Sequence, residues 1–182
     1  EMVSGGHQVT DIAMLYPVES IWPRFVPSRL HTEDCPPDTQ RIQSVFRAAG
    51  NALYSSRRDF TYVDATTICS AAVDQGVLKH GELQWRVLVL PCVDTLPLQA
   101  WENLATFWRS GGAIVALSRL PLNSEREFPC GRVQELAKEI FGSPDSAHAS
   151  TNPAGGVSVF LSPGSEGLLP IVLNSPVAHE VE

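Results

Sequence analysis

The chain has 182 residues, of which 43% are hydrophobic and 18% are charged. This length suits one domain, or one domain plus a partial appendage, and the composition supports a sizeable core and excludes a disordered chain. The 20 acidic and 13 basic residues give a net charge of −7. That balance disfavours nucleic acid and anionic membrane as partners, because both are bound through basic side chains. No apolar run approaches the roughly 18 residues needed to cross a bilayer.

The two ends of the chain show no targeting signal and no recognisable boundary. The opening stretch EMVSGGHQV lacks the basic and apolar regions of a signal peptide. The sequence starts at Glu1 and stops at Glu182, and we expect it to be a fragment of a longer polypeptide. Residues 1–8 are interpreted as a linker, or as a remnant left where this fragment was separated from the longer polypeptide.

The cysteines give no sign of a metal site. They are Cys35, Cys69, Cys92 and Cys130, and no two of them stand at CxxC spacing. No histidine lies near any of them at ligand spacing, which disfavours zinc. One or two disulfides could form if the protein is exported, and the pairing stays open.

The first elements in chain order are a strand and a proline-rich loop. Residues 9–16, VTDIAMLY, form a short apolar run that ends before Pro17 and predicts a buried strand. Residues 17–38 contain five prolines in 22 residues. This density predicts a long loop, because each proline removes a hydrogen-bond donor and biases its neighbour away from helix.

A helix and a second strand follow the loop. Apolar residues at helical spacing predict a helix over about 39–55, with Asp38 or Thr39 as its N-cap. Residues 59–64, DFTYVD, favour a strand. Asp64 follows this strand and could cap a short helix that runs to about Ala72.

The second half of the chain alternates strands and helices. The strongest strand signal is RVLVLP, which is apolar on both faces and predicts a central parallel strand. Pro97 suits the first turn of the next helix, and the glycines after Ser110 suit its end. The remaining expectations are a turn with short extended pieces over 76–85, strands over 113–118, 156–162 and 170–174, and a helix over 132–141 closed by Gly142.

The alternating pattern predicts an α/β fold: a flavodoxin-like three-layer sandwich with a mostly parallel sheet and helices on both faces. The predicted domain spans 9–145, and residues 146–182 either complete it or lead to the next domain. In such a sheet a ligand site lies beyond the carboxyl ends of the strands. Those ends carry Glu19, Asp64, Cys92, Asp94 and Arg119.

Three stretches together resemble a known domain type: IAMLYPVESIW, DFTYVD and RVLVLPCVDTLPLQAWENLATFWRSGGAIVALSRLP. Their order and spacing resemble the flavodoxin-like, glutamine-amidotransferase-like domain of α-L-rhamnosidase-type glycoside hydrolases. That domain is akin to the trimerisation domain of family A4 β-galactosidases. The similarity covers roughly residues 9–121.

The resemblance implies a non-catalytic auxiliary domain of a larger carbohydrate-active enzyme, bacterial and plausibly periplasmic or secreted. Its partners would be the catalytic domain of the same polypeptide, a second subunit in a homo-oligomer, and carbohydrate. The catalytic carboxylates of the parent would lie in a separate barrel domain. No catalytic residue carries over, because no position here matches a catalytic motif.

Cys92 is the candidate nucleophile of an alternative, a thiol-dependent amidotransferase-like hydrolase. A nucleophile of that kind sits on a strand-to-helix elbow, flanked by small residues whose N–H groups form an oxyanion hole. Here the flanks are Pro91 and Val93, and β-branched Val93 tolerates positive φ poorly. A His-x-Glu base is also missing, with His179-Glu180 the nearest approximation. A small buried thiol is the simpler interpretation.

The acidic residues at the sheet edge have two interpretations. Glu19 and Asp94, with Asp64 near them, could perform acid–base work or bind a sugar hydroxyl or a cation. Alternatively, Asp94 caps the helix that starts near Pro97, and Glu19 is a solvated loop charge.

Trp22 lies next to Arg24 in the proline-rich loop and is the aromatic residue best placed for an exposed contact with a sugar or a neighbouring domain. Trp101 and Trp108, seven residues apart on one helix, read as a core stripe instead. We expect no cofactor. No Gly-Lys-Ser/Thr phosphate loop occurs, and PVESIWPRF is unlike the Ser/Thr-rich first loop of a flavin-binding flavodoxin.

Overall fold

The computed structural model describes residues 9–26, 35–143 and 146–174. Residues 1–8, interpreted above as a linker, lie outside this part, as do 27–34, 144–145 and 175–182. A six-stranded sheet with strand order β2-β1-β6-β7-β9-β8 forms the centre of the fold. Every neighbouring pair is parallel except β8–β9. Its strands are β1 (Ile12–Leu15), β2 (Thr61–Val63), β6 (Val87–Pro91), β7 (Ala113–Leu117), β8 (His148–Thr151) and β9 (Val157–Leu161).

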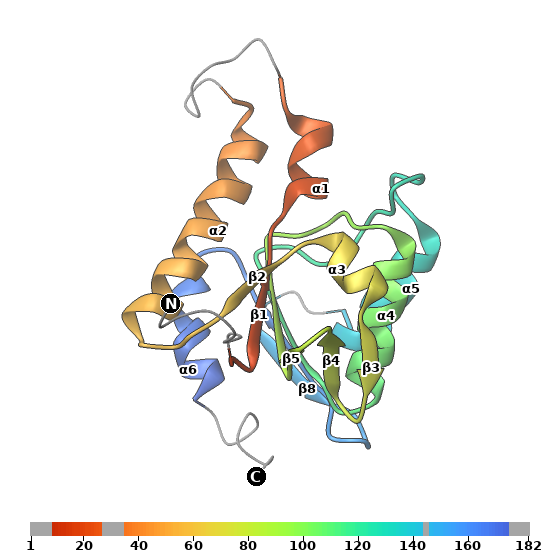
Figure 1. Cartoon of the computed structure of the whole chain (residues 1–182). Coiled ribbons are helices and arrows are strands. Elements are labelled where there is room, and N and C mark those ends of the chain that lie inside the picture. The colour runs from red at the N-terminus through yellow and green to blue at the C-terminus, as the bar shows by residue number, and fades with distance from the viewer. Residues whose placement is uncertain (1–8, 27–34, 144–145, 175–182) are drawn as a thin grey trace, which may run out of the picture.

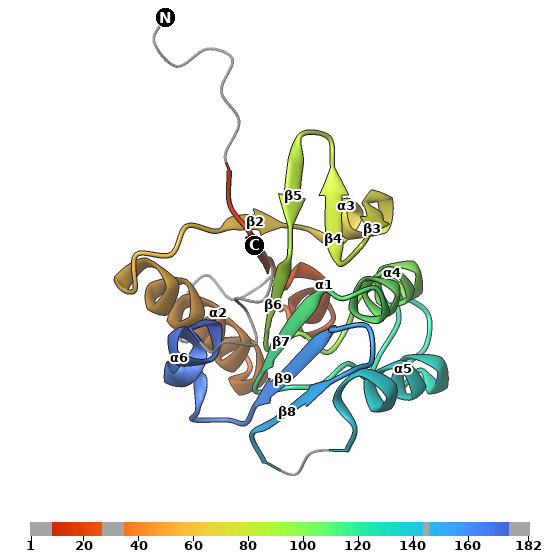
Figure 2. The ribbon, with the colours of Figure 1, turned by 90° about the horizontal axis from the view of Figure 1, so that it is seen from below.

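Helices cover both faces of this sheet, which confirms the predicted α/β sandwich (Figures 1 and 2). The helices α2 (Pro37–Ser55) and α6 (Leu169–Leu173) lie on one face. The helices α3 (Ala65–Ser70), α4 (Leu98–Arg109) and α5 (Gly131–Phe141) lie on the other. The short segments α1 (Val18–Ile21), η1 (Trp22–Arg24) and η3 (Glu166–Leu168) occupy loops. No helix in the described part is long and apolar enough to cross a bilayer.

The core has two halves, one on each side of the sheet. Met14, Ile42 and Leu53 are fully buried between the sheet and α2. Trp101 is 2% exposed and Trp108 is 7% exposed on the α4 side, so both tryptophans belong to the core as expected. Strand β6 is buried along its whole length between β1 and β7, which confirms it as a central parallel strand.

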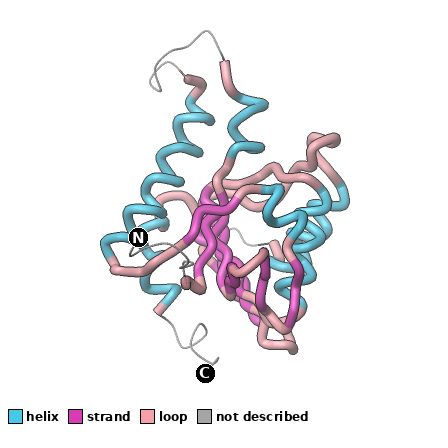
Figure 3. The backbone as a smooth tube through the Cα atoms, viewed as in Figure 1, coloured by secondary structure: helices cyan, strands magenta, loops and turns pink. Residues whose placement is uncertain are grey.

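A second, antiparallel sheet precedes β6. Its strands are β3 (Ala72–Asp74), β4 (Val77–His80) and β5 (Leu83–Trp85), in the order β3-β4-β5. Figure 3 shows these strands beside the central ones. Leu78 and Trp85 bury their side chains in the α4-side core. The extended pieces predicted for residues 76–85 are therefore a β-hairpin.

Near the carboxyl end of the chain, one expectation is wrong and one strand was missed. The segment PIVLN, predicted as a strand, belongs to α6, because Pro170 suits a first helical turn and Leu169 and Leu173 bury one face at i, i+4 spacing. Strand β8 was not predicted, since only one of its four residues is apolar. It adds antiparallel to β9, and β9 adds to β7.

Candidate functional site

The carboxyl edge of the sheet brings together loops from distant parts of the chain. The loop after β1 forms α1 and η1, the loop after β6 carries Asp94, and the loop after β7 carries Arg119. The first turn of α2 adds Asp38 from the side. Four charged side chains therefore meet where parallel strands end, which is the expected place for a site in this fold.

Asp94 is the centre of this group. It is 3% exposed. Its Oδ2 accepts hydrogen bonds from Arg24 Nη2 at 2.7 Å and from Arg119 Nη1 at 2.8 Å. Its Oδ1 accepts from Thr95 Oγ1 at 2.8 Å and from Arg24 Nη1 at 3.2 Å. Both carboxylate oxygens thus accept hydrogen bonds, and three of the four donors belong to positively charged guanidinium groups.

Asp38 joins the same two arginines from α2. Its Oδ2 accepts a hydrogen bond from Arg24 Nε at 2.8 Å, and its Oδ1 accepts one from Arg119 Nη2. The hydrogen bond from Arg119, aided by the charge of both guanidinium groups, holds the pKa of Asp38 below its ordinary value. We call Arg24, Asp38, Asp94 and Arg119 the arginine–aspartate quartet. It carries two positive and two negative charges, so it is neutral as a unit.

The Ser20 side chain joins the loop after β1 to the backbone of the loop after β6. Its Oγ accepts from the backbone N–H of Asp94 at 3.2 Å and of Thr95 at 3.1 Å, and donates to the Thr95 carbonyl at 3.3 Å. Arg24 Nη1 also donates to the Ser20 carbonyl at 2.5 Å. Ser20 is fully buried, so α1 and η1 are held against the sheet from inside.

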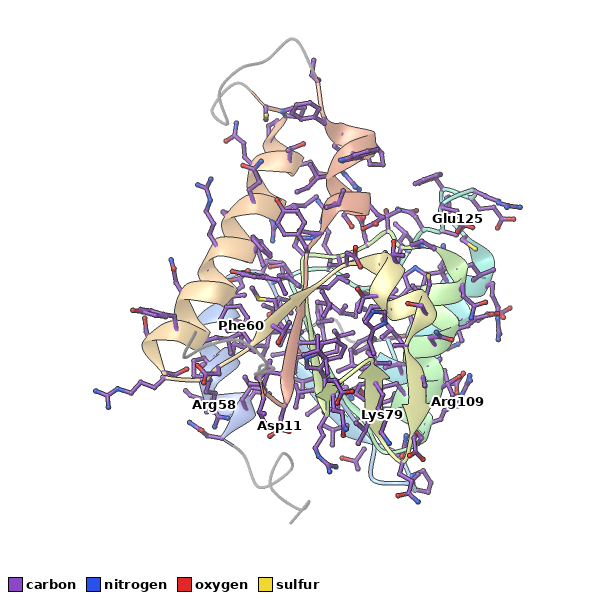
Figure 4. The ribbon with its side chains drawn as sticks, in the orientation of Figure 1. Asp11, Arg58, Phe60, Lys79, Arg109 and Glu125 are labelled. Atoms are coloured by element: carbon purple, nitrogen blue, oxygen red, sulfur yellow. The ribbon has the colours of Figure 1, made fainter. Side chains whose placement is uncertain are left out.

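Asp94 does not cap α4, contrary to one of the two interpretations. The backbone N–H of Leu98 instead donates to Glu125 Oε2 at 2.8 Å, from a loop on the α4 side of the fold (Figure 4). That hydrogen bond lowers the pKa of Glu125. Asp38 likewise caps nothing, because Pro36 is the N-cap of α2 and makes no side-chain hydrogen bond. Asp38 and Asp94 instead form ion pairs with arginines, and the spacing of these residues in the sequence did not indicate these pairs.

Cys92 lies directly after β6 in a left-handed conformation, with φ +58°. This φ is that of a strained elbow, but the side chain is fully buried in the core half under α2. Burial raises the pKa of its thiol, although the nearby charges of Arg119 and Arg41 oppose the rise. Its backbone N–H donates to the Leu117 carbonyl at 2.9 Å. Residue 92 therefore offers neither an exposed sulfur nor a free amide for an oxyanion.

Asp64 and Glu19 lie near enough at the carboxyl edge for the charge of Asp64 to act on Glu19. Asp64 caps α3 as predicted, since its Oδ1 accepts from the Thr67 N–H at 2.7 Å, and hydrogen bonding to Thr67 lowers its pKa. Glu19 is partly buried rather than solvated, and burial, with the charge of Asp64, raises its pKa. Its Oε2 is buried and has no hydrogen-bond partner within the described ranges.

Aromatic side chains are exposed beside the quartet. Trp22, on η1, is 76% exposed and Phe25 is 48% exposed, so Trp22 is accessible as expected.

Between β2 and α2, ring contacts join Tyr16 to Phe46 and Phe46 to Tyr62, with centroids 5.1 and 5.4 Å apart. Phe60, labelled in Figure 4, continues this row at 5.1 Å from Tyr62.

Within the part of the chain that the structure describes, no cluster of His, Cys, Asp and Glu could hold a metal ion. Among the residues proposed from sequence, the structure joins Arg24 to Asp94 and places Glu19 near Asp64. It separates Cys92 from solvent. Sequence reasoning missed Asp38 and Ser20 as members of this edge. It placed Arg119 at the edge, directly after the predicted strand over 113–118, but did not pair it with Asp94.

Comparison with solved structures finds the same fold in β-galactosidases. No protein-family model matches the sequence, and no curated protein matches it either. A β-galactosidase from Rahnella sp. R3 aligns with a TM-score of 0.53 and 16% identity over 83% of this chain. Gan42B, a GH42 β-galactosidase from G. stearothermophilus, aligns as a catalytic mutant with a TM-score of 0.54 and 13% identity over 82% of this chain. A second structure of Gan42B aligns with a TM-score of 0.52 and 12% identity over 81%.

The chain spans about a fifth of the length of these structures, at 20%, 21% and 20%. The chain therefore shares its fold with one part of each of these β-galactosidases. This agrees with the glycoside-hydrolase side of the sequence resemblance.

Replacing Asp94 by Asn should destabilise the fold by about 3 kcal/mol. The substitution removes the buried negative charge that Arg24 and Arg119 share, and leaves Asp38 as the one carboxylate of the quartet beside them. Urea unfolding at pH 7 measures the change. Asp74→Asn is the matched control, since Asp74 forms an exposed ion pair with Lys79, and it should cost less than about 1 kcal/mol. Equal effects of the two variants would contradict a central role for Asp94.

Replacing Glu19 by Gln should stabilise the fold at pH 7. The pKa of Glu19 is raised in the folded state, so ionisation disfavours folding progressively as the pH rises above the ordinary pKa of about 4.5. Below that pH both states are protonated and the difference should shrink. Unfolding free energies of wild type and Glu19→Gln from pH 4 to pH 7 test this, with exposed Glu82→Gln as control. A stability difference that does not grow with pH would contradict the argument.

Cys92 should react with iodoacetamide only as fast as the fold opens. Burial and a raised thiol pKa both suppress reaction in the native state. Peptide mapping after timed labelling at neutral pH, with and without urea, measures the rate at each cysteine. Fast, selective native-state labelling of Cys92 would support the thiol-enzyme alternative.

Proposed function

We propose that this chain is a non-catalytic auxiliary domain of a larger carbohydrate-active enzyme, of the α-L-rhamnosidase-like glycoside hydrolase type. In this role the carboxyl edge of the sheet contacts the catalytic domain of the same polypeptide or a partner subunit. The loop carrying Trp22 could also line part of the substrate cleft. The role is physical positioning rather than bond making.

The observation that carries the proposal is the closed hydrogen bonding of the quartet. A general acid or base needs a carboxyl group that can exchange a proton with substrate. Both carboxylate oxygens of Asp94 accept hydrogen bonds, from Arg24, Arg119 and Thr95, and the side chain is buried. Arg24 and Arg119 in turn each form ion pairs with both carboxylates, Asp38 and Asp94. At the sheet edge where a catalytic site would lie, the charged groups of the quartet are therefore bonded to one another rather than available to a substrate.

The same contacts prepare a surface for a partner. Arg24, the last residue of η1, is fixed by Asp94, Asp38 and the Ser20 carbonyl. Trp22 lies two residues earlier, so its backbone is held while its side chain stays exposed. Binding then costs less conformational entropy than ordering a free loop would. Tryptophan and arginine are also the residues most enriched at interface hot spots.

Carbohydrate binding by Trp22 is the second candidate, favoured by its 76% exposure. An open indole face can stack on the C–H surface of a pyranose ring. The thiol-dependent hydrolase that would use Cys92 has less support, because the sulfur is buried and the Cys92 amide is already bonded.

Two measurements test the auxiliary role. The 182-residue chain should show no turnover of aryl α-L-rhamnosides or aryl β-galactosides, and turnover above the buffer rate would overturn the proposal. In the intact parent enzyme, Trp22→Ala should raise KM or weaken subunit association about tenfold, as expected for a hot-spot aromatic. Tyr54→Ala, at an 80% exposed position on α2, is the matched control and should change neither. Equal effects of both variants would contradict the interface.

Tryptophan fluorescence titrated with rhamnose and galactose separates the two candidates. A shift abolished by Trp22→Ala assigns Trp22 to sugar. The absence of a shift supports the interdomain role.

A further inference from the structure

The helix α2 and the turn after it carry a concentration of arginine. Residues 39–58 contain Arg41, Arg47, Arg57 and Arg58 and no Asp or Glu. All 20 acidic residues lie elsewhere in the chain. In a protein whose net charge is −7, this segment is therefore a positive region.

The arginines of this region lack the ion pairs that most other basic side chains make. In the described part, ion pairs are formed by Arg24, Lys79, Arg109, Arg119, Arg126 and Arg132. Among the same residues, no carboxylate pairs with an arginine of 39–58. Arg58 donates instead to the neutral side chain of Asn174. Guanidinium groups without a carboxylate can accept an anionic group from outside the chain.

Arg47 lies at the rim of the row of rings between β2 and α2. Its neighbour Phe46 contacts Tyr16 and Tyr62, which are 48% and 54% exposed. A methyl group at Gly50 would lie 3.2 Å from the Tyr62 hydroxyl, so the ring of Tyr62 reaches α2 one turn after Phe46. The exposed rings and the unpaired arginine therefore form one surface.

This surface also holds an unsatisfied polar group. Gln43 lies three and four residues before Phe46 and Arg47 on α2, on the same side of the helix. Its Oε1 is buried and accepts no hydrogen bond from any described residue. A buried amide oxygen without a donor costs free energy. A hydroxyl group that reached this amide would supply the missing donor.

We propose that the surface formed by Tyr16, Gln43, Phe46, Arg47 and Tyr62 binds an acidic oligosaccharide, one whose sugar units carry carboxylates. The C–H face of a pyranose ring stacks on the exposed tyrosines. A carboxylate accepts two parallel hydrogen bonds from the guanidinium group of Arg47. A sugar hydroxyl donates to Oε1 of Gln43.

The remaining arginines of 39–58 extend the attraction to a longer anionic chain. Arg58 and Phe60, both labelled in Figure 4, lie on the segment that joins α2 to β2. Their positions carry positive charge and aromatic surface on from Tyr62. A neutral saccharide would leave the arginines unpaired, and an acidic peptide would present no pyranose face to the rings. The choice of a saccharide rests on the proposed carbohydrate-active parent.

Isothermal titration calorimetry of the 182-residue chain with trigalacturonate, from about 10 μM to about 10 mM, tests this site. The neutral galactotriose of the same linkage should bind at least about tenfold more weakly. Salt screens the attraction between arginine and carboxylate, so trigalacturonate should bind more weakly in about 500 mM than in about 50 mM NaCl. Arg47→Gln and Tyr62→Ala should each raise the dissociation constant for trigalacturonate at least about tenfold.

Arg86→Gln is the matched control. Arg86 is an exposed arginine directly before β6, and it forms no ion pair with a described residue. Its replacement should leave the dissociation constant within about twofold. Arg47 is exposed, so Arg47→Gln should fold normally, and circular dichroism checks this for every variant.

Three outcomes would overturn the proposal: no binding of trigalacturonate up to about 10 mM, equal binding of galactotriose, or an equal loss in Arg86→Gln and Arg47→Gln. Binding of a hexa-aspartate peptide as tight as that of trigalacturonate would overturn it too, and would assign the surface to an acidic protein. The glycosidase assays above report on the auxiliary role independently, because their outcome does not require trigalacturonate to bind.

Discussion

The buried carboxylate of Asp94 is the constraint on which the carboxyl edge of this domain depends. Burying a carboxylate until it is 3% exposed is costly unless hydrogen-bond donors replace the water that it has lost. Arg24 and Arg119 supply those donors from two different loops, and Asp38 on α2 balances their second positive charge. Moving any one of these elements would leave a charge without its partner. The loops after β1, β6 and β7 are therefore placed by electrostatics as much as by apolar packing.

This arrangement uses the position at which related sandwich folds place their chemistry. Cys92 has the left-handed backbone of a nucleophile elbow, yet its sulfur points into the core and its N–H bonds to the Leu117 carbonyl. The charged groups of the quartet, which could have bound a substrate at this edge, instead form ion pairs with one another. What remains accessible is the aromatic surface of η1, with Trp22 and Phe25 carried on a segment that the arginine fixes. Such a surface favours contact over catalysis.

The two faces of the sheet are covered differently. On one face, α3, α4 and α5 pack over large buried rings that include Trp85, Trp101 and Phe107. On the other, α2 and the five-residue α6 leave a groove of about 220 Å³ whose lining residues are uncharged. The valines on its floor, Val115, Val157 and Val159, are nevertheless buried, so the apolar core is closed on this side as well.

Alternating apolar runs and helical stripes in the sequence were enough to predict the α/β sandwich, the central position of β6, the core role of Trp101 and Trp108, and the capping role of Asp64. These features depend on neighbours in the chain and on the fraction of apolar residues. The segment PIVLN was misread because five residues cannot distinguish strand from helix until Leu169 and Leu173 are seen to share a buried side. The pairing of Arg24 with Asp94 and of Arg119 with Asp38 joins residues 70 and 81 positions apart. No local pattern encodes such distances, so only the tertiary structure could show that these charges neutralise one another and close the edge.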